Sequence, residues 1–357
     1  MSEQKLFTVG PVQMAAEVWA AGSVQPPYFR TGAFSEFMLG LERDLLVLMD
    51  APAGARAVFL SSSGTGAMEA SLASLATPED DKLLIIRAGG FGDRFVQLAE
   101  GLGLSYDICD LPETEELSAA HLVPFANRGY TAVTVTHCET SNGKLQDLGV
   151  VSHFARSEGA LTLVDAVSSF LCEPLSMKQQ QLDLVLTASQ KALALSPGLA
   201  PVALSPAAQA RIRARSTRSS TRPYYLDLAA ALRNMERGQP PYSPAISILQ
   251  QLRARLDQID GDLEQELQRV HDLAGYFRQE VTKRTSYTLP SWRLAAGVTL
   301  LLAEDGGMET LFTELQDRGF VLNPCGGPVA DTRIRVGHMG ALTRADYDKL
   351  IDTMLTR

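Results

Sequence analysis

Short apolar segments rich in β-branched residues alternate with longer amphipathic segments along the first half of the chain. The apolar segments end at turn-forming residues and lie at 57–60, 83–86, 131–136, 161–164 and 182–186. Strands that are buried on both faces of a parallel sheet form continuous apolar runs, and the helices that cover those faces form amphipathic repeats. The alternation therefore predicts an α/β fold with a mostly parallel sheet and crossover helices.

The pattern changes after Pro244. Apolar residues then recur every three or four positions from Ile246 to Phe277, which predicts one long helix, or two helices joined near Gly261. Strand-like segments follow at 297–302, 320–322 and 333–336, with helical patterns at 308–315 and 344–355. The second half of the chain therefore has a different architecture from the first.

A chain of 357 residues is longer than one hydrophobic core usually fills. Together with the change of pattern, this length predicts a large domain over residues 1–260, which includes an N-terminal arm. A small α+β domain is expected over residues 261–357. The basic, polar run at 217–222 is expected to be a surface loop.

Composition excludes several classes of protein. Hydrophobic residues make up 45% of the chain and charged residues 20%, so general disorder is excluded. A net charge of −9 argues against nucleic acid as a partner. The four cysteines form no C-x-x-C pair, so neither a disulfide framework nor a thiolate metal site is expected. No secretory signal or membrane-length apolar run is found, so we expect no membrane partner and a cytoplasmic location.

Three polar features follow predicted strands, which is where ligands bind in open α/β sheets. Residues 63–66 (Ser-Gly-Thr-Gly) precede a helix and could hold a phosphate on backbone N–H groups, or form a plain strand-to-helix turn. Asp165 could pair with a cationic ring nitrogen or cap the next helix. Lys191 lies between apolar stretches, where burial would lower its pKa and make the amine nucleophilic; its side chain could instead extend to solvent.

Two further residues have chemistry suited to a site. Phe91, among glycines, could stack on a planar ligand or belong to the core. Arg335, in the alternating segment 333–337, could bind a carboxylate bidentately or be solvated. A phosphate cradle, an aromatic ring, an acid, a lysine and an arginine follow one another along the chain. Pyridoxal phosphate requires this combination of groups.

The same residues lie in segments that resemble the class-V aminotransferases of fold type I. The resemblance is to the branch of alanine–glyoxylate, serine–pyruvate and 2-aminoethylphosphonate–pyruvate aminotransferases, and it extends nearly from end to end. The segments that carry it are Val-Gly-Pro (9–11), Ser-Ser-Gly-Thr-Gly-Ala-Met-Glu-Ala (62–70), Gly-Phe-Gly-Asp-Arg (90–94), His-Cys-Glu-Thr-Ser-Asn-Gly (137–143), Asp-Ala-Val-Ser-Ser (165–169), Ala-Ser-Gln-Lys-Ala-Leu (188–193), Tyr-Ser-Pro-Ala (242–245) and Arg-Val-Gly-His-Met-Gly (335–340). The segments around Lys191 and Arg335 are the most specific.

The resemblance implies a mostly parallel seven-stranded sheet in the large domain, pyridoxal 5'-phosphate as cofactor, and a homodimer with shared active sites. It makes Lys191 the Schiff-base lysine and Asp165 the partner of the ring nitrogen. The other roles that it implies are phosphate binding for Ser63, Gly64, Thr65 and Gln190, ring stacking for Phe91, proximity to the ring hydroxyl for Thr140, contact with the neighbouring subunit's cofactor phosphate for Tyr242 and Ser243, and substrate binding for Arg335 and Gly10.

The implied reaction is transamination between a small amino donor, of the alanine, serine or 2-aminoethylphosphonate type, and pyruvate or glyoxylate. The donor stays open, because family members usually carry His-Arg where this chain has Phe29 and Arg30. A cysteine desulfurase with Cys325 as nucleophile is one alternative, although those enzymes place a histidine where Gln190 stands. Another lyase or a cyclase of this fold is a second alternative.

Two readings from other classes are less favoured. A nicotinamide-dependent oxidoreductase would need a fuller glycine fingerprint than residues 63–66 provide. A binding protein without catalytic activity would not need both Asp165 and Lys191.

Overall fold

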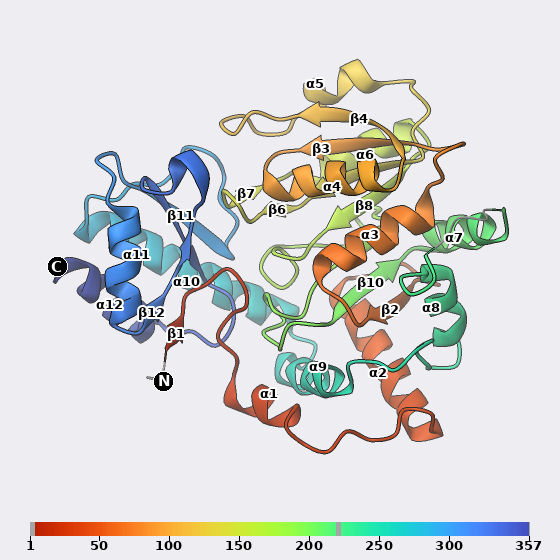
Figure 1. Cartoon of the computed structure of the whole chain (residues 1–357), viewed down its shortest axis with the longest axis horizontal. Coiled ribbons are helices and arrows are strands. Elements are labelled where there is room, and N and C mark those ends of the chain that lie inside the picture. The colour runs from red at the N-terminus through yellow and green to blue at the C-terminus, as the bar shows by residue number, and fades with distance from the viewer. Residues whose placement is uncertain (1–3, 219–222, 357) are drawn as a thin grey trace.

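A seven-stranded sheet forms the centre of the larger part of the molecule (Figure 1). The computed structural model describes residues 4–218 and 223–356. Across the sheet, the strands follow the order β2 (Arg56–Leu60), β10 (Ala200–Leu204), β9 (Leu184–Leu186), β8 (Leu161–Asp165), β5 (Ala132–Thr136), β3 (Lys82–Arg87) and β4 (Ser105–Asp110). Strand β10 is antiparallel to both of its neighbours and all the other pairs are parallel, so the predicted mostly parallel sheet is confirmed.

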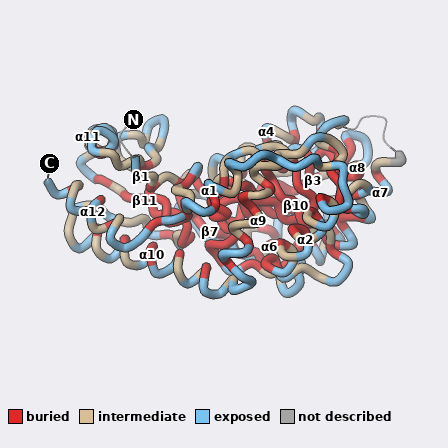
Figure 2. Tube along the Cα trace, turned by 90° about the horizontal axis from the view of Figure 1, so that it is seen from below, coloured by how far each residue is buried: buried red, intermediate tan, exposed pale blue. Residues whose placement is uncertain are grey.

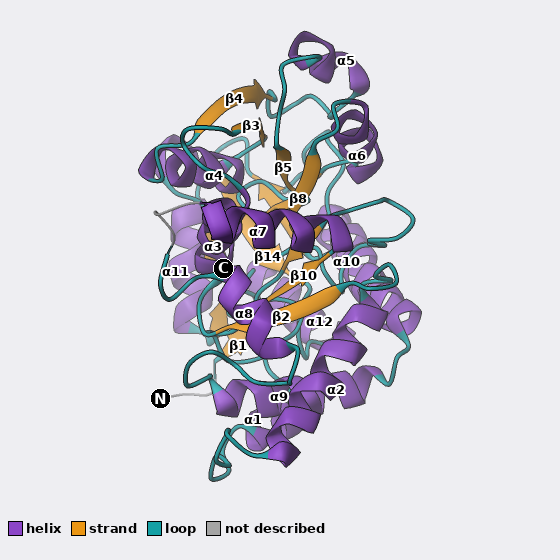
Figure 3. Cartoon of the chain, turned by 90° about the vertical axis from the view of Figure 1, so that its right-hand side faces the viewer, coloured by secondary structure: helices purple, strands orange, loops and turns teal. Residues whose placement is uncertain are grey.

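Helices cover both faces of this sheet, which explains why its strands are apolar along their whole length. All five residues of β5 are buried. Helices α4 (Gly90–Gly101) and α6 (Leu148–Ser157) lie on opposite sides of the strands (Figure 3). Helix α3 (Gly64–Leu75) packs beside α4, and buried segments are concentrated in this part of the molecule (Figure 2).

A three-stranded antiparallel sheet forms the centre of the smaller part. Its strands follow the order β11 (Val298–Leu302), β14 (Arg333–Gly337) and β13 (Asn323–Pro324). Three helices accompany it, namely α10 (Leu263–Arg284), α11 (Met308–Asp317) and α12 (Arg344–Leu355). The strand predicted at 320–322 forms β12 (Phe320–Val321), which belongs to a separate two-stranded sheet.

The long amphipathic stretch after Pro244 forms two helices rather than one. Helix α9 (Ile246–Ile259) ends at Asp260, which has a left-handed backbone with φ 48°, and Gly261 follows with φ 74°. Helix α10 begins two residues later, capped by the side chain of Asp262. These two left-handed residues break the continuous pattern of apolar side chains into two helices.

The first residues of the chain connect the two parts. Strand β1 (Lys5–Leu6) pairs in parallel with β12, and Phe7 is fully buried in the core of the smaller part. A few residues later, the Val12 N–H donates to the Gln190 carbonyl of the larger part (3.2 Å). The domain boundary between residues 260 and 261 stays a prediction.

The remaining expectations concern the surface. In the predicted loop at 217–222, Thr217 and Arg218 end helix α7 (Pro206–Arg218), and residues 219–222 lie outside the described chain. Within residues 4–218 and 223–356, no helix is both long and apolar enough to cross a membrane. The same residues contain no group of three or more His, Cys, Asp or Glu side chains that could hold a metal ion.

Candidate active site

Parallel strands bring three predicted site residues to one edge of the large sheet. Strands β5, β8 and β9 are parallel neighbours, so their carboxyl ends meet at the same edge. Asp165 is the last residue of β8, and Thr140 and Lys191 follow β5 and β9 in the chain. The local sequence predicted each strand, and the parallel pairing brings together the residues that follow them.

Lys191 is buried at this edge and has no carboxylate bonded to its amine in the described chain. The Nζ donates a hydrogen bond to the Val9 carbonyl oxygen. Burial lowers the pKa of Lys191 to about 8, although the nearby Cys138 and Asp165 oppose the shift. A lysine amine with a pKa near 8 is neutral in a useful fraction of molecules at neutral pH, which nucleophilic attack requires.

Asp165 is buried beside the lysine and keeps one oxygen available. Its Oδ1 accepts a hydrogen bond from the Val167 N–H (2.9 Å), and Oδ2 accepts none from the described residues. Burial raises the pKa of Asp165 to about 6; the Val167 hydrogen bond opposes the shift, and the charge of Glu139 adds to it. A positive partner at Oδ2 would hold this carboxyl in its ionised form.

The predicted phosphate cradle lies at the start of helix α3. Ser63 is the N-cap residue, and its side chain accepts a hydrogen bond from the Gly66 N–H (3.4 Å). A Cβ at Gly64 would stand 2.8 Å from Cγ2 of Val167, so glycine is needed for this turn to approach the segment after Asp165. Nearby in sequence to Lys191, the Oε1 of Gln190 is buried and has no hydrogen-bond partner in the described chain.

Arg94 joins two of the predicted cofactor residues, and its own sequence context predicts no role for it. Its guanidinium carbon lies 4.5 Å from the centre of the Phe91 ring, and its Nη1 donates to Thr65 Oγ1 (3.1 Å). Phe91 and Thr65 are therefore connected, although helices α4 and α3 hold them separately. The signals in the sequence were the position of Arg94 one helical turn after Phe91 and its place in the segment 90–94, which carries part of the family resemblance.

Glu139 is a second residue without a predicted role. Its buried carboxylate accepts hydrogen bonds from the Phe91 and Gly92 N–H groups (3.0 and 3.1 Å) and from Ser141 Oγ (2.9 Å). It lies in β6 (Cys138–Glu139), which pairs with β7 (Lys144–Leu145) in a short hairpin. The signals available in the sequence were an acidic residue in an otherwise buried segment and its place in the segment 137–143, which carries part of the family resemblance.

Thr140 connects the edge of the sheet to the smaller part of the molecule. Its hydroxyl and that of Ser168 are 2.5 Å apart, and its carbonyl oxygen accepts a hydrogen bond from Nη1 of Arg335 (3.2 Å). Nη2 of Arg335 donates to the Pro324 carbonyl (2.7 Å). The Nε of Arg335 is buried and has no hydrogen-bond partner in the described chain.

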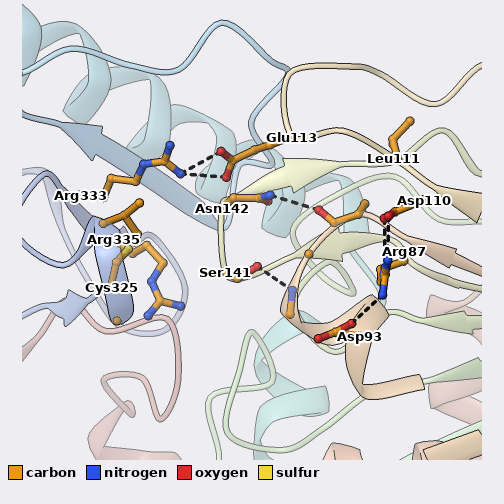
Figure 4. Close-up of a pocket in the computed structure, with 15 residues that line it drawn as sticks. Arg87, Asp93, Asp110, Leu111, Glu113, Ser141, Asn142, Cys325, Arg333 and Arg335 are labelled. Atoms are coloured by element: carbon orange, nitrogen blue, oxygen red, sulfur yellow. Dashed lines mark hydrogen bonds and ion pairs between the residues drawn. The ribbon is translucent and has the colours of Figure 1, made fainter. Parts of the chain in front are cut away.

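A cavity of about 550 Å³ opens between the two parts, and Arg335 lies on its wall (Figure 4). Two other arginines in this wall are neutralised: Arg87 bonds Asp110 (2.7 Å), and Arg333 bonds both oxygens of Glu113 (2.8 and 3.0 Å). No carboxylate pairs with Arg335 among the residues of the described chain. Arg335 therefore offers this cavity an uncompensated positive charge.

Tyr242 and Ser243 do not line the cavity that contains Arg335, and they contact a different set of residues. The Tyr242 hydroxyl donates to the Tyr224 carbonyl (2.8 Å), and its ring stacks on that of Tyr225 with centroids 5.3 Å apart. Ser243 lines a separate small hollow together with Ser61. Their predicted contact with a neighbouring subunit stays a prediction.

With this geometry established, comparison with known proteins identifies the family. The model of the family described as "Aminotransferase class-V" matches residues 31–321, which is most of the chain. The protein belongs to the class-V aminotransferases. It is therefore an enzyme of that family, as the resemblance implied.

Similar proteins extend this class-V likeness to nearly the whole chain. The 2-aminoethylphosphonate–pyruvate transaminase of Phocaeicola vulgatus is 27% identical, over 84% of this chain and 83% of that protein. A protein named soluble hydrogenase 42 kDa subunit, from Anabaena cylindrica, is 26% identical over 96% of this chain and 89% of its own length. The crystal structure of the alanine–glyoxylate aminotransferase from Nostoc sp. is 26% identical and superposes with a TM-score of 0.91, covering 99% of this chain and 95% of that one.

Proposed function

We propose that this enzyme is a pyridoxal 5'-phosphate-dependent aminotransferase in which Lys191 holds the cofactor as a Schiff base. It transfers the amino group of a small donor, of the alanine, serine or 2-aminoethylphosphonate type, to pyruvate or glyoxylate. The observation that carries the proposal is the buried amine of Lys191, with a pKa lowered to about 8, at the same sheet edge as Asp165.

The residues at this edge fit the cofactor. Asp165 has a free carboxylate oxygen for a protonated ring nitrogen, and the start of α3 offers backbone N–H groups for a phosphate. The unpartnered Oε1 of Gln190 shows that this buried amide lacks a hydrogen bond that a bound group or a water could complete. When bound, pyridoxal phosphate supplies a ring that accepts electrons from the substrate's α-carbon.

Each protein group then has a defined task. With the cofactor and donor bound, Lys191 Nζ would remove the proton from the donor's α-carbon; a pKa near 8 suits a general base at neutral pH. Asp165 keeps a proton on the ring nitrogen through its charge. Arg335 binds the carboxylate of the 2-oxo acid, for which its uncompensated charge and planar donors are suited. Phe91 covers the ring.

A homodimer with shared sites is part of the proposal. Tyr224 and Tyr225, which surround Tyr242, are 83% and 51% exposed. Tyrosine is enriched in protein interfaces, so this surface is suited to a neighbouring subunit whose cofactor phosphate Tyr242 and Ser243 would reach. The free cysteines favour a reducing compartment, and we place the enzyme in the cytoplasm.

The desulfurase alternative depends on Cys325, which lines the same cavity. Burial raises the pKa of the Cys325 thiol, against the opposing effect of Arg335, and a thiol with a raised pKa is a weak nucleophile. The raised pKa of Cys325 therefore argues against a desulfurase, and transamination stays the proposal.

The decisive experiment compares the purified enzyme with Lys191→Ala. The wild type should show the visible absorbance of lysine-bound pyridoxal phosphate, and the variant should bind the cofactor reversibly without that absorbance and lose turnover. Retention of the band in the variant would refute the assignment of Lys191. Single-turnover reactions with a panel of amino donors then identify the donor. Release of ammonia or sulfide without an acceptor would instead indicate a lyase or a desulfurase.

A further inference from the structure

Helix α4 takes its N-terminal side-chain cap from a distant segment of the chain, as α11 does from Asp331. The helices α2 (Gly32–Leu48), α3, α6, α10 and α12 each accept a cap from the short polar side chain at their own N-cap position. Helix α4 has Gly89 at that position and no local side-chain cap. Its first N–H groups instead donate to Glu139, a residue 48 positions further along the chain. A cap from so distant a segment ties the helix start to the hairpin of β6 and β7.

The packing around Gly89 is built to admit Glu139. A Cβ at Gly89 would stand 2.4 Å from Cγ of Glu139 and 2.7 Å from Oγ of Ser141. Ser141 Oγ accepts a hydrogen bond from the Gly90 N–H (3.2 Å) and donates to the Glu139 carboxylate. The backbone from Gly89 to Gly92 is therefore held by the hairpin at three successive N–H groups.

Glu139 is costly to bury, because no lysine or arginine of the described chain pairs with it. Burial raises the pKa of its carboxyl, and hydrogen bonds from Gly92, Phe91 and Ser141 oppose the shift. A helix cap alone does not need such a group, since an exposed Asp147 caps α6 with two backbone hydrogen bonds (2.8 and 3.3 Å). The burial of Glu139 is therefore better explained by a role in the site to which the first turn of α4 contributes Phe91.

We propose that Glu139 is the positioning residue for Phe91, and that it fixes where the Phe91 ring meets the cofactor. The inference rests on the proposed function, in which Phe91 covers the pyridoxal phosphate ring. Glu139 bonds the backbone of Phe91 itself, and the same helical turn carries Arg94, which lies over the ring and bonds Thr65 of the phosphate cradle. Loosening this turn would displace the aromatic ring and the arginine together.

The test is a double-mutant cycle between Glu139→Gln and Phe91→Ala, read as affinity for pyridoxal phosphate. The enzyme is stripped of cofactor and titrated, with visible circular dichroism reporting how the ring is held. Aromatic contacts of this kind correspond to about a 3- to 10-fold change in affinity, and we expect Glu139→Gln to weaken binding by that factor. Because Glu139 acts through Phe91, the same change should have no further effect in the Phe91→Ala background.

Glu42→Gln is the matched control. Glu42 is also a buried carboxylate that accepts a backbone N–H, from Ala57 (2.9 Å), but it pairs with Arg56 at the far edge of the sheet. This variant should lower the melting temperature and leave cofactor affinity within about twofold of wild type. If Glu139→Gln does not fold, Ser141→Ala removes one hydrogen bond from the same carboxylate. It should weaken binding about twofold, again only when Phe91 is present.

Two outcomes would overturn the inference. Unchanged affinity and dichroism in folded Glu139→Gln, or equal losses from Glu139→Gln with and without the Phe91 ring, would show that Glu139 serves the fold alone. If the wild type itself binds no pyridoxal phosphate, the proposed function fails and the inference fails with it. The wild-type titration therefore separates the two failures.

Discussion

The backbone of Gly10 lies directly against the side chain of Lys191. A Cβ at Gly10 would stand 2.6 Å from Cδ and 2.8 Å from Cε of the lysine, and Gly10 has a φ of +124°, which other residues rarely adopt. We expect Gly10→Ala to displace the lysine and reduce kcat about tenfold or more, since strain of this kind costs about 1–3 kcal/mol. Steady-state kinetics provide the measurement.

Gly103→Ala is the control for that variant. Gly103 also has a positive φ, of +67°, but nothing lies within 4 Å of its added Cβ. It should lower stability and leave kcat unchanged. Equal kcat values for Gly10→Ala and the wild type would show that the contact with Lys191 is not needed for turnover.

The lowered pKa of Lys191 gives the cofactor-free enzyme a defined pH dependence. Only the neutral amine attacks the aldehyde of pyridoxal phosphate, so the incorporation rate should rise with pH and level off above the pKa of about 8. Between about pH 7 and pH 9, the neutral fraction and the rate should increase about tenfold. Stopped-flow absorbance after cofactor addition measures the rate. A rise of about a hundredfold without a plateau would mean that the pKa of Lys191 is near its ordinary value.

Asp165→Asn tests the charge at the ring nitrogen. The amide oxygen can still accept the Val167 hydrogen bond, so the fold should be retained. Loss of the charge should slow removal of the donor's α-proton by several orders of magnitude, the scale that a lost preorganised electrostatic partner reaches. Single-turnover kinetics with the preferred donor give this rate, and a near-normal value would reduce Asp165 to a residue that caps the following turn.

Arg335 should determine how efficiently the enzyme uses 2-oxo acids as acceptors. Removal of one partner of a buried charged pair costs about 2–5 kcal/mol, so Arg335→Ala should reduce kcat/KM for pyruvate and glyoxylate about 30-fold or more. Arg335→Lys keeps the charge but loses the planar pair of donors, and it should lose less. The absorbance of the substrate-free enzyme should not change. A kcat/KM within about threefold of wild type for Arg335→Ala would contradict the acceptor assignment.

Phe7 anchors the N-terminal segment in the core of the smaller part, where it is fully buried beside Tyr347. Phe7→Ala should lower the free energy of unfolding of that part by about 3–5 kcal/mol, through lost burial and the cavity left behind. Denaturant unfolding monitored by tyrosine fluorescence measures the change. Val123→Ala, at a residue that is 70% exposed, should change it by less than about 0.5 kcal/mol.

The large sheet and the positions of Lys191 and Asp165 could be predicted because the signals are local. Each strand is a continuous apolar run, and the residue that ends it lies at the edge where its parallel neighbours also end. The two residues of β1 carry no such signal, since two positions define no period. Their pairing with β12 joins segments more than 300 residues apart, which a reading along the chain does not detect.

The same reasoning explains which site residues were missed. Glu139 and Arg94 lie in segments that resemble the family, but the sequence assigns them no role, because each makes its contact with another element of the fold. Gly89 and Gly90 were visible as a glycine pair, but the sequence does not show that the missing side chain of Gly89 makes room for Glu139 and Ser141. The role of such a residue can be recognised only in the folded structure, where the residue that it contacts lies beside it.

The pairing of β1 with β12 has a consequence for the order in which the parts of the enzyme fold. Residues 5–13 bond to β12, to Gly337 and to Ala341, all of which lie more than 300 residues further along the chain. The strands of the large sheet all lie between residues 56 and 204, but Val9 and Gly10 reach Lys191 as part of a segment whose strand partners lie beyond residue 318. Contacts of such long sequence separation form late in folding. The surroundings of Lys191 are therefore completed only after the segment from residue 319 to residue 341 has been made, and a chain without that segment would leave Lys191 without its N-terminal cover.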